Sequence, residues 1–125
     1  MKSKLMMALG SNYEQLENME KAKSKLRSMF PDIRFSSALW TEPIGIPSDD
    51  RFVNMLAVAH TDLEREQVEM ELKRIERECG RCAEEKEKCI IRMDIDLMSY
   101  DGEKFHPKDW ARDYIITLMS ELEGE

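Results

Sequence analysis

The sequence predicts an α+β sandwich, in which helices pack on one face of an antiparallel sheet and one further helix follows at the C-terminus. Four short apolar segments with strand character alternate with two segments of helical periodicity, in the order βαββαβ. The chain has 125 residues, 42% of them hydrophobic and 36% charged, which is enough for one ordinary globular domain spanning residues 1–125. The ferredoxin-like arrangement is the simplest topology that fits this order of elements.

The first strand is predicted at Leu5–Leu9, an apolar run that stops at the turn Gly10-Ser11-Asn12. Small residues at such a turn let the backbone approach a ligand closely, but we favour the simpler interpretation that Ser11 or Asn12 caps the helix that follows. That helix is predicted from apolar residues at helical spacing, namely Leu16, Met19, Leu26 and Met29 or Phe30. Pro31 ends the segment.

Two strands are predicted in the middle of the chain. Apolar residues alternate with polar or small ones over residues 33–39, which indicates the second strand, and Phe52–His60 reads as a third strand that is apolar on both faces. Between them, Thr41–Asp50 contains two prolines and a glycine and is predicted to be an irregular loop.

The second helix is predicted from a start signal, an apolar face and a stop signal. Thr61-Asp62-Leu63-Glu64 is a capping-box pattern, with threonine at the cap and glutamate three residues on. Gly80 supplies a stop. The apolar face between these signals consists of Val68, Leu72, Ile75 and Cys79.

Three segments remain in the C-terminal part of the chain. Arg81–Lys88 is charged and lacks apolar periodicity, so it is predicted to be a loop. Ile90–Leu97 is predicted to form the fourth strand, and Trp110–Leu122 the last helix.

Composition and charge exclude two broad classes of protein. Nineteen Lys and Arg residues face 26 Asp and Glu residues, and the net charge of −7 disfavours binding to nucleic acid. No stretch approaches the roughly 20 apolar residues that cross a bilayer, and the apolar run at the N-terminus is far too short for a signal peptide. We therefore expect a cytoplasmic protein without membrane partners; the sequence does not indicate an oligomeric state.

The three cysteines, Cys79, Cys82 and Cys89, are an odd number and make a poor disulfide framework. Cys79 and Cys82 form a C-x-x-C pattern, to which Cys89 would add a third zinc ligand. His60 and His106 are both distant in sequence, so a fourth ligand at the usual spacing is missing. We favour reduced thiols without a chemical role over a zinc or redox site.

The segment Arg92-Met93-Asp94-Ile95-Asp96 carries the strongest chemical pattern. Strand alternation sends Met93 and Ile95 to one face, and Arg92, Asp94 and Asp96 to the other. Two carboxylates on one face raise each other's pKa, and a divalent cation removes that cost. Oxygen ligands of this kind suit magnesium, whereas the alternative is a solvated strand face that Arg92 neutralises.

The loop after the second strand is a further candidate. Thr41-Glu42-Pro43-Ile44-Gly45 is stiffened by proline, and Arg51-Phe52-Val53-Asn54 follows it. An aromatic ring beside an amide can stack on a flat heterocycle and hydrogen-bond to it, although a phenylalanine at such a position is more often part of the core.

These motifs, in this order, resemble the 6-hydroxymethyl-7,8-dihydropterin pyrophosphokinase family. The resemblance runs from about Leu5 to Leu97 with similar spacing between the motifs, and continues more weakly through His106-Pro107, Arg112 and Tyr114. The five motifs that carry it are Ala8-Leu9-Gly10-Ser11-Asn12, Thr41-Glu42-Pro43-Ile44-Gly45, Phe52-Val53-Asn54, Ile75-Glu76 with Gly80-Arg81, and Asp94-Ile95-Asp96-Leu97.

The resemblance implies a ferredoxin-like enzyme of folate biosynthesis that transfers pyrophosphate from ATP to the hydroxymethyl group of the pterin and leaves AMP. It implies that Asp94 and Asp96 hold two Mg²⁺ ions and that Arg81 and Arg92 are catalytic. The residues expected around ATP are Glu76, Arg81, His106 and Arg112. The residues expected around the pterin are Thr41, Pro43, Ile44, Phe52, Asn54 and Tyr114.

Several features depart from the family pattern. The stretch 82–91 has no tryptophan and carries Glu84, Glu85 and Glu87, and Ile91 stands where the family places an arginine. Arg92 comes one residue later, so either a bulge restores its direction or it lies beside the aspartates as a counter-ion. The stretch from Asp96 to His106 is about eight residues shorter than the resemblance implies.

These departures keep other functions open. One is a homologue that binds pterin and nucleotide without efficient catalysis, and another is the same chemistry on a different substrate. A third is a structural interaction domain that uses the acidic surface and the ten methionines.

Overall fold

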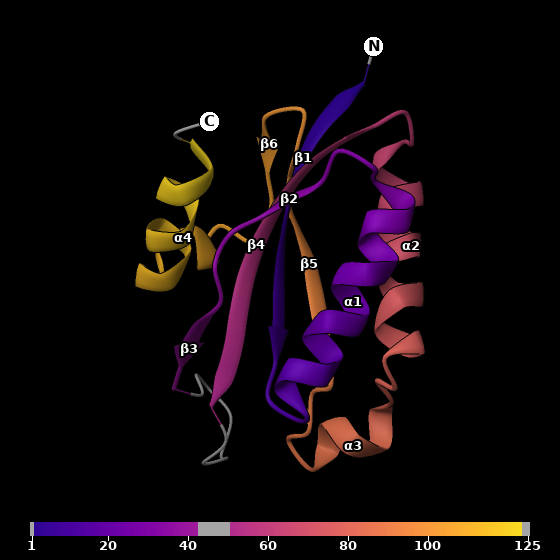
Figure 1. Cartoon of the computed structure of the whole chain (residues 1–125), viewed down its shortest axis with the longest axis vertical. Helices are drawn as coiled ribbons and strands as arrows, with labels where there is room; N and C mark the ends of the chain where they lie inside the picture. The colour runs from indigo at the N-terminus through magenta and orange to yellow at the C-terminus, as the bar shows by residue number, and fades with distance from the viewer. Residues whose placement is uncertain (1, 43–50, 124–125) are drawn as a thin grey trace.

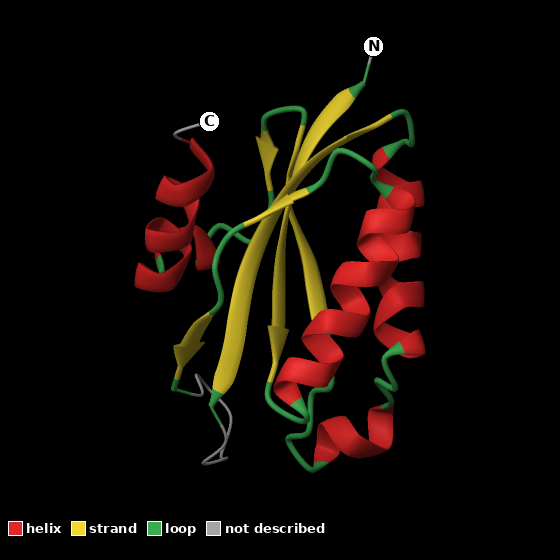
Figure 2. Ribbon diagram, in the orientation of Figure 1, coloured by secondary structure: helices red, strands yellow, loops and turns green. Residues whose placement is uncertain are grey.

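A computed structural model of the chain describes residues 2–42 and 51–123. Pro43 and Ile44 therefore lie outside the described residues. The described part contains a six-stranded antiparallel sheet in the order β2-β4-β1-β5-β6, with β3 also paired to β4 (Figures 1 and 2). The strands are β1 (Ser3–Ser11), β2 (Arg34–Phe35), β3 (Leu39–Thr41), β4 (Phe52–Thr61), β5 (Asp94–Tyr100) and β6 (Glu103–Lys104).

The helices cover both faces of this sheet. Figure 1 shows α1 and α2 on one side and α4 on the other, with the short α3 beyond the C-terminal end of α2. Their bounds are α1 (Gln15–Met29), α2 (Arg65–Glu78), α3 (Ala83–Glu87) and α4 (Asp113–Glu123), and a 3₁₀ turn, η1 (Asp109–Ala111), precedes α4. The predicted α+β class with a C-terminal helix is confirmed, and the opposite placement of α4 makes the sheet a central layer.

Two hydrophobic cores follow from this layering. On the side of α1 and α2, the buried residues include Leu5, Met7 and Leu9 of β1, which alternate along the strand. On the side of α4, Met6 of the same strand packs with Leu118 and its neighbours. Because both faces of β1 are covered, its sequence is a continuous apolar run without polar alternation.

The start of α2 differs from the prediction. Thr61 is the last residue of β4, paired with Ser3 of β1, and its hydroxyl accepts a hydrogen bond from the Leu63 backbone N–H at 3.1 Å. The N-cap is Glu64, whose side chain bonds the backbone of Gln67 while the Gln67 side chain accepts the Glu64 N–H at 3.0 Å. The capping box is therefore real, but it lies three residues later than predicted.

Other boundaries also moved. The predicted loop Arg81–Lys88 contains α3, which has no buried residues and therefore gives no apolar periodicity to detect. β5 begins at Asp94 rather than Ile90, and it continues into a hairpin with β6 that was not predicted. The turn is Asp101-Gly102, and both residues have positive φ, as expected for a two-residue hairpin.

The second predicted strand is split into β2 and β3 by a buried serine. The Ser36 N–H donates to the Leu56 carbonyl at 2.9 Å, and the Leu56 N–H donates to the Ser36 hydroxyl at the same distance. The Ser36 hydroxyl thus takes the place of a backbone carbonyl in the pairing with β4. Backbone pairing with β4 resumes in β3, at Leu39–Thr41. This re-pairing places Thr41 opposite Phe52.

Among residues 2–42 and 51–123, no helix has both the length and the apolar composition needed to cross a bilayer.

The packing of α4 on the sheet gives a stability prediction. Ile115 is fully buried, whereas its neighbour Ile116 is 54% exposed. Ile115→Ala is expected to lower the free energy of unfolding by about 2–5 kcal/mol, because it leaves a cavity against the sheet. Ile116→Ala serves as the matched control and is expected to change it by less than about 0.5 kcal/mol. Urea denaturation measures both, and equal effects would contradict the described packing of α4.

Candidate active site

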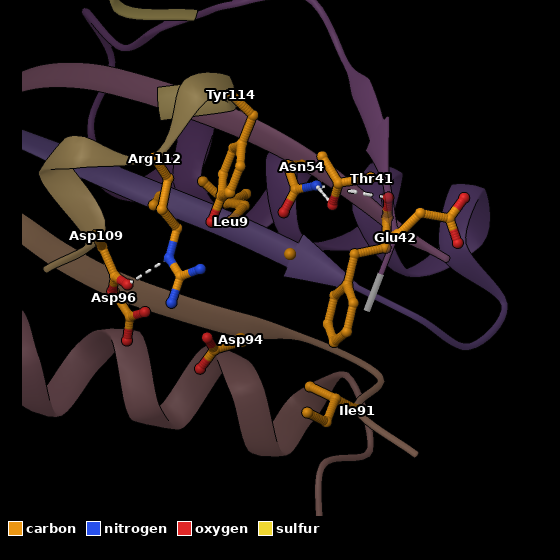
Figure 3. Close-up of a pocket in the computed structure, with 13 residues that line it drawn as sticks. Leu9, Thr41, Glu42, Asn54, Ile91, Asp94, Asp96, Asp109, Arg112 and Tyr114 are labelled. Carbon is orange, nitrogen blue, oxygen red and sulfur yellow. Dashed lines mark hydrogen bonds and ion pairs between the residues drawn. The ribbon is translucent and has the colours of Figure 1, made fainter. Parts of the chain in front are cut away.

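A pocket of about 200 Å³ opens where the ends of β1 and β3 and the starts of β4 and β5 meet η1 and α4 (Figure 3). The antiparallel register explains this meeting, because Gly10 of β1 lies between Asn54 of β4 and Asp94 of β5. The lining residues are Ala8, Leu9, Gly10, Thr41, Glu42, Phe52, Asn54, Ile91, Asp94, Asp96, Asp109, Arg112 and Tyr114.

Gly10 has no side chain to fill the bottom of the pocket. A Cβ atom at this position would lie 3.5 Å from Asn54 Oδ1 and 3.6 Å from the Phe52 ring, which is ordinary van der Waals contact. A side chain there is therefore sterically possible, but it would fill the space between these two groups. The small residue leaves backbone and amide open to a ligand.

Asn54 is oriented by its amide nitrogen. Nδ2 donates to Thr41 Oγ1 at 2.7 Å and to the Leu39 carbonyl at 3.2 Å, which ties β4 to β3. Within the described residues, Oδ1 has no hydrogen-bond partner and lies near Gly10 at the pocket floor. The site thus presents one fixed acceptor beside the Phe52 ring, a combination that suits a flat heterocycle with N–H groups.

Asp94 and Asp96 line the pocket from alternate positions of β5, while Ile95 between them is buried in the core. Burial, followed by the neighbouring Asp94 charge, raises the pKa of Asp96 to about 7. His106 Nε2 lies 4.0 Å from Asp96 Oδ1 and favours the charged carboxylate. A raised carboxyl pKa of this kind shows an electrostatic cost that a bound cation would relieve.

Arg81 connects this carboxylate pair to α2. Its Nη1 lies 2.8 Å from Asp94 Oδ1 and 3.1 Å from Glu76 Oε2. Glu76 is only 5% exposed, and its Oε2 accepts the Ile95 backbone N–H at 2.7 Å. Burial raises the pKa of Glu76, whereas the hydrogen bond from Ile95 and the Arg81 charge favour its ionised form.

Arg92 does not lie with the aspartates, so both alternatives considered from the sequence are wrong. Its guanidinium donates to both oxygens of Glu85, at 2.7 and 2.9 Å, and to Glu14 Oε1 at 2.8 Å. It also lies 4.7 Å from the centroid of the Tyr13 ring. The alternation failed because β5 begins only at Asp94, so the strand period does not apply to Arg92.

Ile91 lines the pocket in place of a basic residue, and Asn12 holds it there. The Ile91 N–H donates to Asn12 Oδ1 at 2.7 Å, and the Asn12 N–H donates to the Ile91 carbonyl at 3.0 Å. Asn12 Nδ2 also donates to the Cys89 carbonyl at 2.8 Å. The favoured role of Ser11 or Asn12 as a helix cap is therefore wrong, because Glu14 occupies the N-cap of α1.

The remaining predicted residues come from the C-terminal segment. Arg112 and Tyr114 line the pocket, and Arg112 Nε donates to Asp109 Oδ1 at 2.8 Å, as Figure 3 shows. Burial raises the pKa of Tyr114. His106 is not part of the lining, but it lies close to Asp96. The sequence analysis missed Asp109 as a lining residue, since it belongs to no recognisable motif, and noted Ile91 only as a departure from the family arginine.

The cysteines lie outside this pocket. Cys79 is buried, Cys82 exposed and Cys89 half-buried, and all three are free thiols. Among the residues that the structure describes, no three His, Cys, Asp or Glu side chains form a group that could hold a metal ion.

This fold and pocket define an α+β protein whose pocket combines a carboxylate pair and one arginine, Arg112, with an aromatic and amide surface. A sequence model of the family described as 7,8-dihydro-6-hydroxymethylpterin-pyrophosphokinase (HPPK) matches residues 6–124. The chain belongs to this family, which supports a pterin pyrophosphokinase activity in folate biosynthesis that uses ATP as co-substrate. A search of curated proteins gives no match.

The Arg92 contacts give a prediction about pH. Arg92 lowers the pKa of Glu85 below its ordinary value of 4.5, so this contact stabilises the fold above pH 4.5, and its contribution is lost as the pH falls through the lowered pKa. Arg92→Gln is expected to return the Glu85 pKa towards 4.5. It is also expected to lower the urea midpoint at pH 7 by more than it does at pH 3. Carboxyl NMR titration and urea denaturation measure the two effects.

Arg74→Gln is the matched control, because Arg74 also contacts two glutamates, Glu71 and Glu78, but both lie on its own helix. Its loss is expected to lower the midpoint less than the loss of Arg92, which joins α3 to the start of α1. Equal losses at pH 7, or an unchanged Glu85 titration in Arg92→Gln, would contradict this account.

Proposed function

We propose that the protein transfers pyrophosphate from ATP to the hydroxymethyl group of 6-hydroxymethyl-7,8-dihydropterin and releases AMP, in a magnesium-dependent reaction. One observation carries this proposal: a single pocket combines Phe52 and Asn54 on one wall with Asp94 and Asp96 on another. The reaction forms a bond between the acceptor oxygen and the β-phosphorus, breaks the bond from the β-phosphorus to the oxygen that AMP keeps, and releases the hydroxyl proton.

The pterin is expected to bind between the Phe52 and Tyr114 walls, with Asn54 Oδ1 accepting hydrogen bonds from its ring N–H groups. Thr41 contributes by fixing the amide orientation of Asn54. Ile91 adds an apolar contact on the β5 side of the pocket. Pro43 and Ile44 stay predictions for this subsite, because they lie outside the described residues.

Magnesium fits the chemistry of the carboxylate pair. Mg²⁺ uses one or two protein carboxylates and completes its coordination with water and phosphate oxygens, so a third protein ligand is not needed. Asp94 and Asp96 would hold it, and the raised pKa of Asp96 indicates a site with uncompensated negative charge. When bound, magnesium would neutralise the phosphates and orient the acceptor hydroxyl.

The two arginines proposed for phosphate binding are oriented by ion pairs with carboxylates. Arg81 is oriented by Glu76 and Asp94, and Arg112 by Asp109. We propose that both guanidiniums contact the phosphates of ATP. His106 lies beside Asp96, so we expect it near the phosphate end of the nucleotide as well. Phosphoryl transfer depends chiefly on positioning and charge neutralisation, which these residues supply without a covalent intermediate.

A second candidate is a homologue that binds both ligands without efficient turnover, or that acts on a different acceptor. One observation favours it. Ile91 occupies the pocket wall at the position of the family arginine, and Arg92 is bonded to Glu85 and Glu14 outside the pocket. AMP formation from ATP with and without the pterin distinguishes turnover from binding alone.

Carboxylate substitutions test the catalytic proposal. Asp94→Asn and Asp96→Asn are each expected to lower pterin-dependent AMP formation by about 100-fold or more, because the charge that holds magnesium is lost. Asp101→Asn is the control, since Asp101 lies in the β5–β6 turn, is not part of the pocket lining, and forms its hydrogen bonds with Ser3 and Lys4. Unchanged activity in both site variants would refute the assignment.

The aromatic wall gives a separate prediction. Phe52→Ala is expected to raise the pterin Kd by roughly tenfold or more, since stacking on an aromatic ring contributes about 1–3 kcal/mol. ATP binding is expected to stay unchanged. Phe35→Ala is the control, because that ring lies against Lys23 and Arg27 and is not part of the pocket lining. Titration calorimetry with each ligand measures this, and an unchanged pterin Kd would contradict the proposed stacking.

A further inference from the structure

A second cleft, here called the α2–α3 cleft, lies between the C-terminal half of α2 and the short α3. Its volume is about 250 Å³. Four of its seven lining residues are basic, although the chain as a whole carries a net charge of −7. The lining residues are Lys73, Glu76, Arg77, Arg81, Cys82, Ala83 and Lys86.

The basic residues form a row. Lys73 and Arg77 are four residues apart on α2, so they lie on one side of the helix, about 6 Å of helix rise apart, and Arg81 follows beyond the end of the helix. Lys86 faces them from α3. Like charges at this spacing destabilise a helix slightly unless an anion lies between them.

The cleft residues differ from the other basic residues of α2 in their partners. Arg65 and Arg74 pair with glutamates of their own helix. Lys73, Arg77 and Lys86, by contrast, have no ion-pair partner among the described residues, and all three are exposed. Their positive charge is therefore available to a ligand.

Arg81 joins this cleft to the active-site pocket. Its guanidinium lines the cleft and also bonds Asp94, which lines the pocket. The one acidic residue of the cleft lining, Glu76, is already paired with Arg81. Glu85 is bonded to Arg92, and neither Glu84 nor Glu87 is part of the cleft lining.

We infer that the α2–α3 cleft is an anion subsite, in which Lys73, Arg77 and Lys86 bind phosphate groups of the nucleotide where its polyphosphate chain passes Arg81. This inference rests on the proposed function and adds positioning residues to it that no sequence motif indicates. The ligand chemistry is that of a linear polyphosphate, either on a nucleoside or free in solution.

Binding to the full chain, without magnesium, tests this subsite. Titration calorimetry uses ATP, sodium tripolyphosphate and adenosine, each in EDTA at 50 and 200 mM salt. The wild-type protein is expected to bind ATP and tripolyphosphate, more weakly at the higher salt, and to bind adenosine much more weakly. Lys73→Gln/Arg77→Gln is expected to weaken binding of both polyphosphates by about tenfold or more, and Lys86→Gln by a smaller factor.

Lys2→Gln/Lys104→Gln is the control with the same change of net charge. Lys2 precedes β1 and Lys104 ends β6, and Figure 1 shows the N-terminus and β6 at the opposite end of the sheet from α3. It is expected to bind as the wild type does. Equal losses in the control, or no loss in the α2 variant, would overturn the inference. All substituted side chains are exposed, and urea denaturation verifies that each variant is folded.

Amide NMR shifts on adding tripolyphosphate locate the site independently. We expect shifts over residues 73–86, which would support anion binding in the α2–α3 cleft. Shifts confined to the segment around Arg112 would refute it. Turnover separates this inference from the proposed function. An inactive protein with the expected binding pattern refutes only the function, whereas an active protein whose α2 variant binds normally refutes only the subsite.

Discussion

The buried carboxylate of Glu76 is the interaction on which the geometry of the site depends. Burial of an ionised group is costly unless it is paired and hydrogen-bonded, and Glu76 meets both conditions through the Ile95 N–H and Arg81. The Glu76 carboxylate thereby holds α2 against the first residues of β5. It also orients the Arg81 guanidinium. Arg81 then reaches Asp94. The buried Glu76 of α2 therefore orients the cation that pairs with a carboxylate of the pocket.

A second polar connection holds the other side of the same strand. Asn12 bonds the backbone on both sides of residue 90, and Arg92 joins α3 to the start of α1. The approach to β5 is thus fixed from β1 and from the helices at once. Its consequence for the pocket is that Ile91 faces inward while Arg92 faces outward. Arg92, although close to Asp94 in sequence, therefore connects two helices and does not line the pocket.

The fold class and the shared face of Asp94 and Asp96 could be predicted because they depend on periodic burial and strand alternation, whereas most other predicted pocket residues came from the family resemblance. The alternation at Asp94 and Asp96 and the apolar face of α2 are examples of these periodic patterns. What the sequence did not predict depends on where an element begins. Thr61 and Glu64 both suit a helix cap, and the choice is made by pairing of Thr61 with Ser3 across the sheet. The period that would place Arg92 beside Asp94 holds only within the strand, and α3 buries no side chain that could mark it.

Net charge does not predict the electrostatic field at a cleft, because that field depends on which charges face the cleft and which are already paired. The acidic stretch around α3 illustrates this. One of its glutamates is neutralised by Arg92, and Lys86 in the same helix faces the α2–α3 cleft. Basic residues on α2 extend the positive region from Arg81 away from the pocket. The proposed polyphosphate contacts therefore lie on α2 and at Arg81, which Glu76 holds in place, and not on the approach to β5. Under the proposed function, this arrangement would give an acidic chain with an apolar residue at the family arginine position a basic path for a polyphosphate.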